Sequence, residues 1–302
     1  MFRKRFLLVL LLLAFAVTVA LGEFGGRPGD VVIYLITTKG QMDFQVVPPS
    51  TTNDAATTAN FKTLDTSKVP VAPPDQFPLR RQVLYEQPDE LFQIGVDEEN
   101  SVGKHRLFVV PVKIFVESGS IRPTPTTVGT SATYIIFPQG VDVENDIALE
   151  TVKFLMWSPK AWPFIAPTTS RGPAVPPGMT GFEFILSTPG LIRLPFFIPW
   201  TGMRLIYPSA GWADGVDLKA IDQDPAAGNT TAILRLRPGR RTPLFRIAGN
   251  THFYVLQGSV QLTPANASPI TLNRDFYAFI PKNFAFRVSN PKQFDGPFPT
   301  SQ

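Results

Sequence analysis

The feature that most constrains this 302-residue sequence is a series of short strand-like runs in its last third. Apolar and β-branched residues dominate the runs Val216–Ile221, Ala232–Leu236, Ile270–Leu272 and Phe276–Ile280. Turn-forming residues such as Pro238 and Gly239 separate them, and no long helical heptads occur. Strands this short, with turn signals every 8 to 12 residues or so, are typical of a small antiparallel barrel or jelly roll. We therefore expect an all-β fold.

Two segments inside this region have residues spaced as in the motifs of a known protein family. The first runs from Pro243 through Leu-Phe-Arg-Ile to Gly258, and the second runs from Pro281 through Asn283 to Asn290. They resemble the two motifs of the cupin family. The first of these reads Pro-x-His-x-His, with a glutamate seven residues before a glycine, and the second reads Pro-x-Gly-x-x-His-x-x-x-Asn. The resemblance covers about residues 210–292 and implies a cupin-like double-stranded β-helix, or jelly-roll barrel, at the C-terminus.

The resemblance also places the family's metal-binding positions in this chain. The three histidines of a cupin fall on Phe245, Ile247 and Phe286, and its glutamate falls on Thr251. Phenylalanine and isoleucine offer no lone pair to a transition metal. The whole chain has two histidines and no cysteines, so other imidazoles or thiolates cannot rebuild the set. We expect no metal and no other cofactor, which disfavours metal-dependent oxygenase or isomerase chemistry.

An apolar set of side chains takes the place of the expected ligands, and two interpretations stay open. Phe245, Ile247, Thr251 and Phe286 either fill the barrel and close its core, as is common in small barrels, or line a pocket for an organic ligand. In the second case Arg246 is a candidate to hold an anionic group at the mouth. Both interpretations predict a noncatalytic module for small-molecule binding or for structure.

The enzyme alternative depends on one histidine and two tyrosines. His252, with Tyr254 or Tyr277, would serve a metal-independent isomerase or hydrolase acting on a small sugar-like or anionic substrate. Side chains alternate along a strand, so if Thr251 faces inward His252 faces outward. This placement predicts a surface or interface residue instead of a catalytic base. An open cavity shared by His252 and a tyrosine hydroxyl would favour the enzyme.

The N-terminus predicts a secretory signal over residues 1–22. Arg3, Lys4 and Arg5 precede an apolar run, Phe6–Leu21, and small residues before Glu23 suit cleavage there. An uncleaved anchor is the alternative, but the run is shorter than the roughly 20 residues that span a bilayer. We expect export to the periplasm, the cell envelope or the outside, with no stable membrane span after cleavage.

Charge argues against a nucleic-acid partner. The full chain carries 28 basic and 24 acidic residues, a net charge of +4. Loss of Arg3, Lys4 and Arg5 leaves 25 against 24, or +1, far from the basic excess of a nucleic-acid-binding protein. The partners that we expect are a small-molecule ligand and a second copy of this chain, paired through the barrel.

The rest of the chain is divided by composition. Residues 23–79 predict a hairpin of Val31–Thr37 and Met42–Val47, followed by a Pro/Thr-rich surface arm. Residues 80–175 predict a β-rich domain with strands in Leu91–Val96, Leu107–Val116 and Thr133–Phe137, and residues 176–302 predict the cupin-like barrel. Residues 143–156 fit either one helix or two short strands.

A faint internal repeat bears on the middle region. Thr124-Pro125 and Gln139-Gly140 stand 118 residues before Thr242-Pro243 and Gln257-Gly258, with the same internal spacing. The repeat would make residues 80–175 a diverged second cupin, and the chain a bicupin. The second motif has no clear counterpart in this region, so the question stays open.

Overall fold

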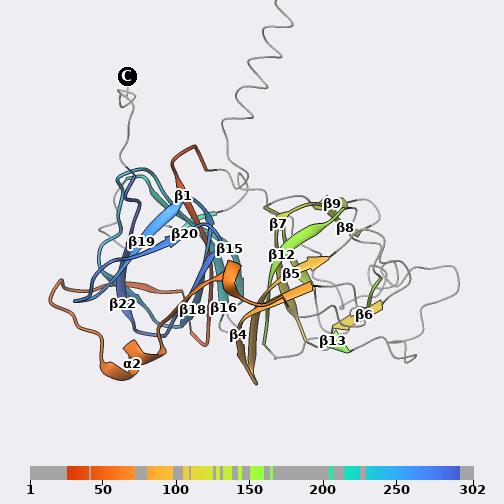
Figure 1. The fold of residues 1–302 in the computed structure, drawn as a ribbon, viewed down its shortest axis with the longest axis horizontal. Coiled ribbons are helices and arrows are strands. Elements are labelled where there is room, and N and C mark those ends of the chain that lie inside the picture. Colours follow the sequence, from red (N-terminus) through yellow and green to blue (C-terminus); the bar gives the residue numbers. More distant parts are fainter. Residues whose placement is uncertain are drawn as a thin grey trace, which may run out of the picture. The chain divides into compact units, whose positions relative to one another are not determined.

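The computed structural model divides the chain into two compact units (Figure 1). The first unit joins residues 1–63 to residues 203–302, and the second contains residues 64–202. The structure describes residues 26–40, 42–71, 80–97, 105–108, 110–124, 127–129, 132–137, 142–144, 150–159, 164–165, 204–206, 214–224 and 229–292. The N-terminal segment thus belongs to the same unit as the C-terminal barrel, whereas the sequence predicted boundaries at residues 79 and 175.

A seven-stranded antiparallel sheet forms one side of the first unit. Its strands, in spatial order, are β14 (Arg204–Ile206), β15 (Val216–Asp224), β16 (Asn229–Leu236), β1 (Val31–Thr38), β18 (Asn250–Gln257), β21 (Phe276–Ile280) and β3 (Lys62–Asp65). The central strand β1 has all eight residues buried, as a strand covered on both faces requires. It pairs with β16 from Val31 opposite Leu236 onward and with β18 on its other side.

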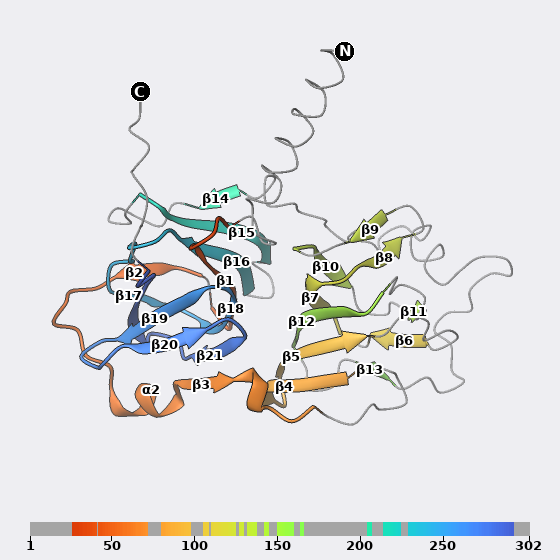
Figure 2. The ribbon, with the colours of Figure 1, turned by 45° about the horizontal axis from the view of Figure 1, so that its top comes forward.

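A five-stranded sheet forms the other side of this unit (Figure 2). Its strands, in spatial order, are β2 (Phe44–Val46), β17 (Phe245–Ile247), β22 (Ala285–Ser289), β19 (Ser259–Pro264) and β20 (Ile270–Asn273). One apolar cluster takes residues from both sheets, including Ile33 and Phe253 from the first and Leu262 and Phe286 from the second. The two inner faces therefore enclose a shared core, as in a jelly roll.

The hairpin predicted near the N-terminus is wrong. Lys39 and Gly40 do form a turn, and both have positive φ angles, 53° and 158°. The chain then crosses to the other sheet, where β2 pairs with β17, while β1 stays between β16 and β18. The chain does turn where the sequence predicted it, but the turn connects strands in two different sheets instead of two paired strands.

The segment after β2 differs from the unpacked arm that the sequence predicted. It contains a six-residue helix, α2 (Ala55–Asn60), in which no residue is buried. Asn53 and Phe61, on either side of α2, nevertheless contact the barrel near β22. This segment is therefore attached at points and exposed between them.

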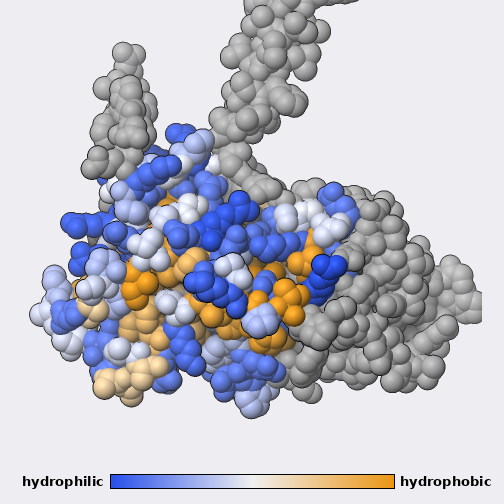
Figure 3. Space-filling view, in the orientation of Figure 1, coloured by the Kyte–Doolittle hydropathy of each residue, from blue (hydrophilic) through white to orange (hydrophobic). Residues whose placement is uncertain are grey.

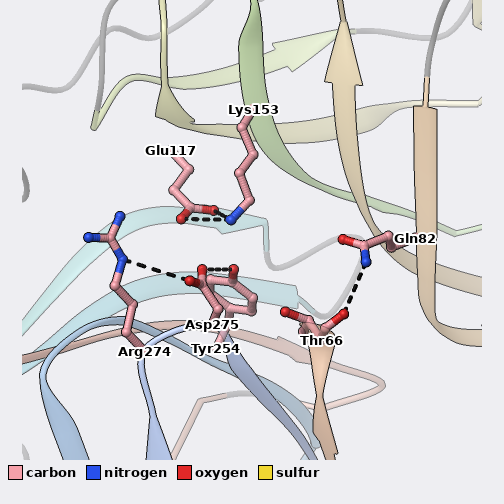
Figure 4. A network of polar contacts seen from close by, with 7 residues as sticks. All are labelled: Thr66, Gln82, Glu117, Lys153, Tyr254, Arg274 and Asp275. Atoms are coloured by element: carbon pink, nitrogen blue, oxygen red, sulfur yellow. Dashed lines mark hydrogen bonds and ion pairs between the residues drawn. The ribbon is translucent and has the colours of Figure 1, made fainter. Parts of the chain in front are cut away.

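The second unit is also built from antiparallel strands. A five-stranded sheet has the order β10 (Tyr134–Phe137), β7 (Val112–Ser118), β12 (Val152–Ser158), β5 (Glu90–Asp97) and β4 (Arg80–Gln87). A three-stranded sheet contains β11 (Asp142–Glu144), β6 (His105–Phe108) and β13 (Phe164–Ile165), and β8 (Ile121–Thr124) pairs with β9 (Thr127–Gly129). The 3-10 turn η1 (Thr66–Lys68) precedes them. Within the large sheet, Lys153 Nζ lies 3.0 Å from Oε2 of the buried Glu117 (Figure 4).

The all-β prediction is confirmed, and most predicted strands are found. Residues 143–156 prove to hold parts of two strands, β11 and β12, and no helix is described there. The predicted signal segment, residues 1–22, lies outside the described residues, as do Pro125, Gln139 and Gly140 of the repeat. Among the residues described, no helix is both long and apolar enough to cross a membrane.

The surface of the first unit is mixed in character. In Figure 3 hydrophilic residues surround hydrophobic ones that gather toward the middle of the face in view. Among the described large apolar side chains, Val46 is exposed in the first unit, and Val71 and Val83 are exposed in the second. Most of the apolar material is thus inside, where the four cupin positions also lie.

Candidate functional site

The barrel interior brings together the four positions that would bind metal in a cupin. Phe245 and Ile247 lie on β17, Thr251 on β18 and Phe286 on β22, and each is at most 2% exposed. Phe245 pairs directly with Phe286 across β17 and β22, and their ring centroids are 4.5 Å apart. Phe245 and Phe286, which come from the two separate motifs, are therefore direct neighbours in space.

Side chains occupy this end of the interior. Phe245, Ile247 and Phe286 belong to the apolar cluster that both sheets share. The fourth position differs because Thr251 is polar, but its hydroxyl oxygen lies 3.1 Å from that of Thr37 on the neighbouring strand β1. Phe245, Ile247 and Phe286 thus belong to one packed apolar cluster, and the Thr251 hydroxyl has its partner on β1.

Arg246 does not belong to this interior set, in contrast to its place among the expected pocket residues. Strand β17 alternates buried, exposed, buried, so Arg246 faces away from Phe245 and Ile247. Its Nε donates to Oε1 of Gln45 on the adjacent strand β2 at 3.2 Å. The side chain stands on the outer surface of the sheet.

The donor set does not fit a cupin metal site. Three of the four positions offer only hydrocarbon, and the fourth offers a neutral hydroxyl, which is a poor ligand for a transition metal. Elsewhere in the described residues, no group of three or more histidine, cysteine, aspartate or glutamate side chains is placed to hold a metal ion. No metal-dependent step can be assigned to these residues.

The opposite face of the seven-stranded sheet carries the histidine and the tyrosines. His252 follows Thr251 on β18 and points away from the interior cluster, and its Nδ1 lies 2.7 Å from the hydroxyl oxygen of Tyr277 on β21. The rings of His252 and Phe279 are 5.7 Å apart. His252 is 0% exposed and Tyr277 is 2% exposed. Strand alternation thus gives the correct face for His252. Of the two positions expected for it, surface or interface, burial excludes exposure to solvent.

Tyr254 makes a separate contact on the same face. Its hydroxyl donates to Oδ1 of Asp275 at 2.7 Å (Figure 4). Asp275 lies in the turn before β21 with φ at 67°, and its Oδ2 is 3.9 Å from Nε of Arg274. The structure therefore brings His252 to Tyr277, while Tyr254 bonds to a turn carboxylate.

A cleft of about 450 Å³ lies at the end of the barrel near the start of β1, and the sequence did not predict it. Its lining includes Asp30, Gln257, Gly258, Asn290 and Lys292. Asn290 Nδ2 donates to the carbonyl oxygens of Gly29 at 2.8 Å and Leu236 at 3.1 Å, and Asp30 Oδ2 accepts from the amide of Arg27 at 2.8 Å. Asn290 thus holds the chain after β22 to the chain before β1, and Asp30 closes a local turn in the latter, so both have structural roles.

Comparison with known proteins supports the fold. The sequence matches no protein-family model and no curated protein. Among solved structures, it is similar to oxalate decarboxylase from Bacillus subtilis at pH 4.6, with 11% identity over 76% of this chain and 73% of that one and a TM-score of 0.53. A proposed dioxygenase from Nostoc punctiforme has 16% identity over 76% of this chain and 78% of that one, with a TM-score of 0.50.

These similarities define a class of fold. The covered share of this chain is larger than either unit, so the likeness is not confined to one of them. At these identities the likeness establishes a cupin-like jelly-roll architecture and carries no activity across. This is therefore an all-β protein of cupin-like fold.

Proposed function

We propose that this is an exported, metal-free protein of cupin-like fold that acts as a noncatalytic module for binding or for structure. The observation that carries the proposal is the set of side chains at the four ligand positions, which supplies three hydrocarbon groups and one hydroxyl. The similar solved structures include enzymes, but metal-dependent chemistry would need ligands that these four residues do not supply.

A metal-reconstitution experiment tests the proposal. The purified protein is incubated with Mn(II), Fe(II), Zn(II) or Ni(II), desalted, and analysed for metal by mass spectrometry. The matched variant restores the family's ligands through Phe245→His, Ile247→His, Thr251→Glu and Phe286→His. We expect the wild type to retain far less than one metal per chain, and the variant to retain more if it folds. A stoichiometric metal in the wild-type barrel would refute the proposal whether or not the variant folds.

An activity assay on the same preparations checks the noncatalytic part. Oxalate is the natural first substrate because similar structures are of oxalate decarboxylase. We expect the Mn(II)-treated wild type to convert oxalate at the rate of the buffer blank. Conversion above the blank that disappears in a Phe286→Leu variant would place catalysis in this interior and overturn the assignment.

The second candidate is a metal-independent isomerase or hydrolase acting on a small sugar-like or anionic substrate. The 2.7 Å contact between His252 and Tyr277 favours it, because a general base needs such a partner. Their burial counts against it. Diethyl pyrocarbonate decides between the two, since the chain has only two histidines. We expect His252 to stay unmodified in the folded protein. Modification at the rate of a free imidazole would make the enzyme the better assignment.

Export and self-association are separate parts of the proposal. Export is supported by the basic and apolar pattern of residues 1–22. The intact mass of the secreted protein should then correspond to a chain that begins at Glu23. A membrane-bound product that keeps Met1 would contradict this. A homodimer through the barrel is proposed from the resemblance to cupins, whose barrels often pair through their sheets. Light scattering should then give twice the mass of one chain, and a monomer at high concentration would exclude the dimer.

A further inference from the structure

Five aromatic rings form a continuous series at one end of the first unit's barrel. Phe44 on β2 lies 5.2 Å from Phe245, Phe245 lies 4.5 Å from Phe286, and Phe286 lies 6.3 Å from Phe284. The series ends on Phe61, whose ring is stacked on Phe284 with centroids 4.7 Å apart and planes 9° from parallel. Four of the five rings are buried, while Phe61 is only partly buried. Phe61 is therefore the outermost member.

Phe61 belongs to a segment that is held at few points. We call residues 47–61, between β2 and β3, the strap. The amide of Val47 donates to the carbonyl oxygen of Leu244 at 3.0 Å. Asn53 makes two bonds to the backbone of Ala285, donating to its oxygen at 3.0 Å and accepting from its nitrogen at 2.6 Å. Asn53 thus occupies both polar groups of a residue next to Phe284, at the same end of the barrel as the ring series.

The rest of the strap makes little buried contact with the barrel. Helix α2 has six residues and none of them is buried, and so short a helix has little stability of its own. Segments with few buried apolar contacts open locally at a smaller free-energy cost than global unfolding. The strands on either side, β2 and β3, are paired in the two sheets. The strap can therefore move away while the barrel stays folded.

Movement of the strap would uncover an apolar surface made of aromatic rings. Phe284, Phe286 and Phe245 are each 1% exposed, and Phe61 covers the outermost of them face to face. Offset stacking is a favourable arrangement for a flat aromatic group, because it buries apolar area and suits the ring quadrupoles. The ring of Phe61 occupies the place that such a group would take.

We propose that Phe61 is a built-in plug of a binding site for a flat, apolar ring compound, which stacks on Phe284 when the strap opens. The inference rests on the proposed noncatalytic binding role and names its ligand class. Apparent affinity for such a ligand is reduced by the fraction of molecules in which Phe61 occupies the site. The chain's own side chain thus competes with the ligand.

The test is a fluorescence titration with the uncharged probe N-phenyl-1-naphthylamine. Phe61→Ala should bind the probe roughly tenfold more tightly than the wild type, because the competitor is gone. Asn53→Ala keeps every ring and loosens the strap, so it should give a smaller gain in the same direction. Lys62→Ala, next to Phe61 on an exposed position, is the matched control and should leave binding unchanged.

A double variant locates the probe. Phe61→Ala combined with Phe284→Ala should lose the gain, because the stacking partner is removed. The proposal is overturned if folded Phe61→Ala and Asn53→Ala both bind like the wild type, or if the gain persists without Phe284. Metal analysis of the same preparations keeps the two questions apart. A metal-free protein without probe binding refutes only the ring site, whereas a metal-loaded wild type refutes the proposed function.

Discussion

The two faces of strand β18 differ in chemistry although both are buried. Thr251, Phe253 and Val255 face the core that the two sheets share, and only the threonine is polar. On the other face, His252 and Tyr254 each make a side-chain hydrogen bond of 2.7 Å. Burial alone therefore does not identify a site. The inner face of β18 is apolar except for Thr251, and the histidine and the tyrosine of this strand lie on the other face.

The largest expected effect comes from truncating the inner face. Phe286→Ala removes a ring that contacts Phe245 and leaves a cavity in the core. Such changes lower the free energy of unfolding by about 3–5 kcal/mol. Denaturant unfolding measures it, with Arg246→Ala as control because that side chain is exposed and should change stability by less than about 0.5 kcal/mol. Equal losses in the two variants would mean that the inner face is not a packed core.

A smaller effect is expected on the outer face. Tyr277→Phe removes the hydroxyl that His252 contacts at 2.7 Å in a fully buried setting. Losing the partner of a buried polar group costs about 1–3 kcal/mol. Tyr254→Phe is the matched variant, because its partner Asp275 is 40% exposed and can bond to water instead. If the two variants lose the same stability, the buried pair has no special role.

The smallest effect is a pH dependence on that same face. Burial is the main cause that raises the pKa of Tyr34 on β1 above its ordinary value of 10.0. The neutral phenol is therefore favoured in the fold, and its contribution is complete below pH 10 and lost as the pH rises above it. At pH 11 the loss is about 1.4 kcal/mol. Tyr34→Phe should flatten this decline in unfolding experiments at pH 9 and pH 11. An identical decline in the variant would contradict the assignment.

Much of the strand pattern could be predicted, because it depends on local signals. Alternating apolar runs and turn residues located β15, β16, β20 and β21 within a few residues. The partner of β1 could not be found this way. All eight residues of β1 are buried, so it lacks the alternation that marks a hairpin strand, and its partners lie in residues 229–257. The turn at Lys39-Gly40 predicted pairing with the next strand along the chain, whereas β1 pairs with strands that are distant in sequence.

The site was predictable to a similar degree. Motif spacing placed Phe245, Ile247, Thr251 and Phe286 together because a barrel fixes which strands are adjacent. It could not place Arg246 on the outer surface until the alternation of β17 was known. Nor could it find Asn53, whose role arises from tertiary contact with the backbone of Ala285. Composition made residues 48–78 resemble a free arm because an anchoring asparagine looks like any other polar residue.

The central place of β1 also has a consequence during synthesis. Val31 pairs with Leu236, so this strand must wait for about 200 residues to be made before one of its neighbours exists. At typical rates of roughly 5–20 residues per second, the delay is on the order of 10–40 seconds. During that time a mainly apolar strand emerges from the ribosome with unpaired edges, a species prone to aggregation. The nascent chain should therefore depend on chaperones more than its mature fold would suggest.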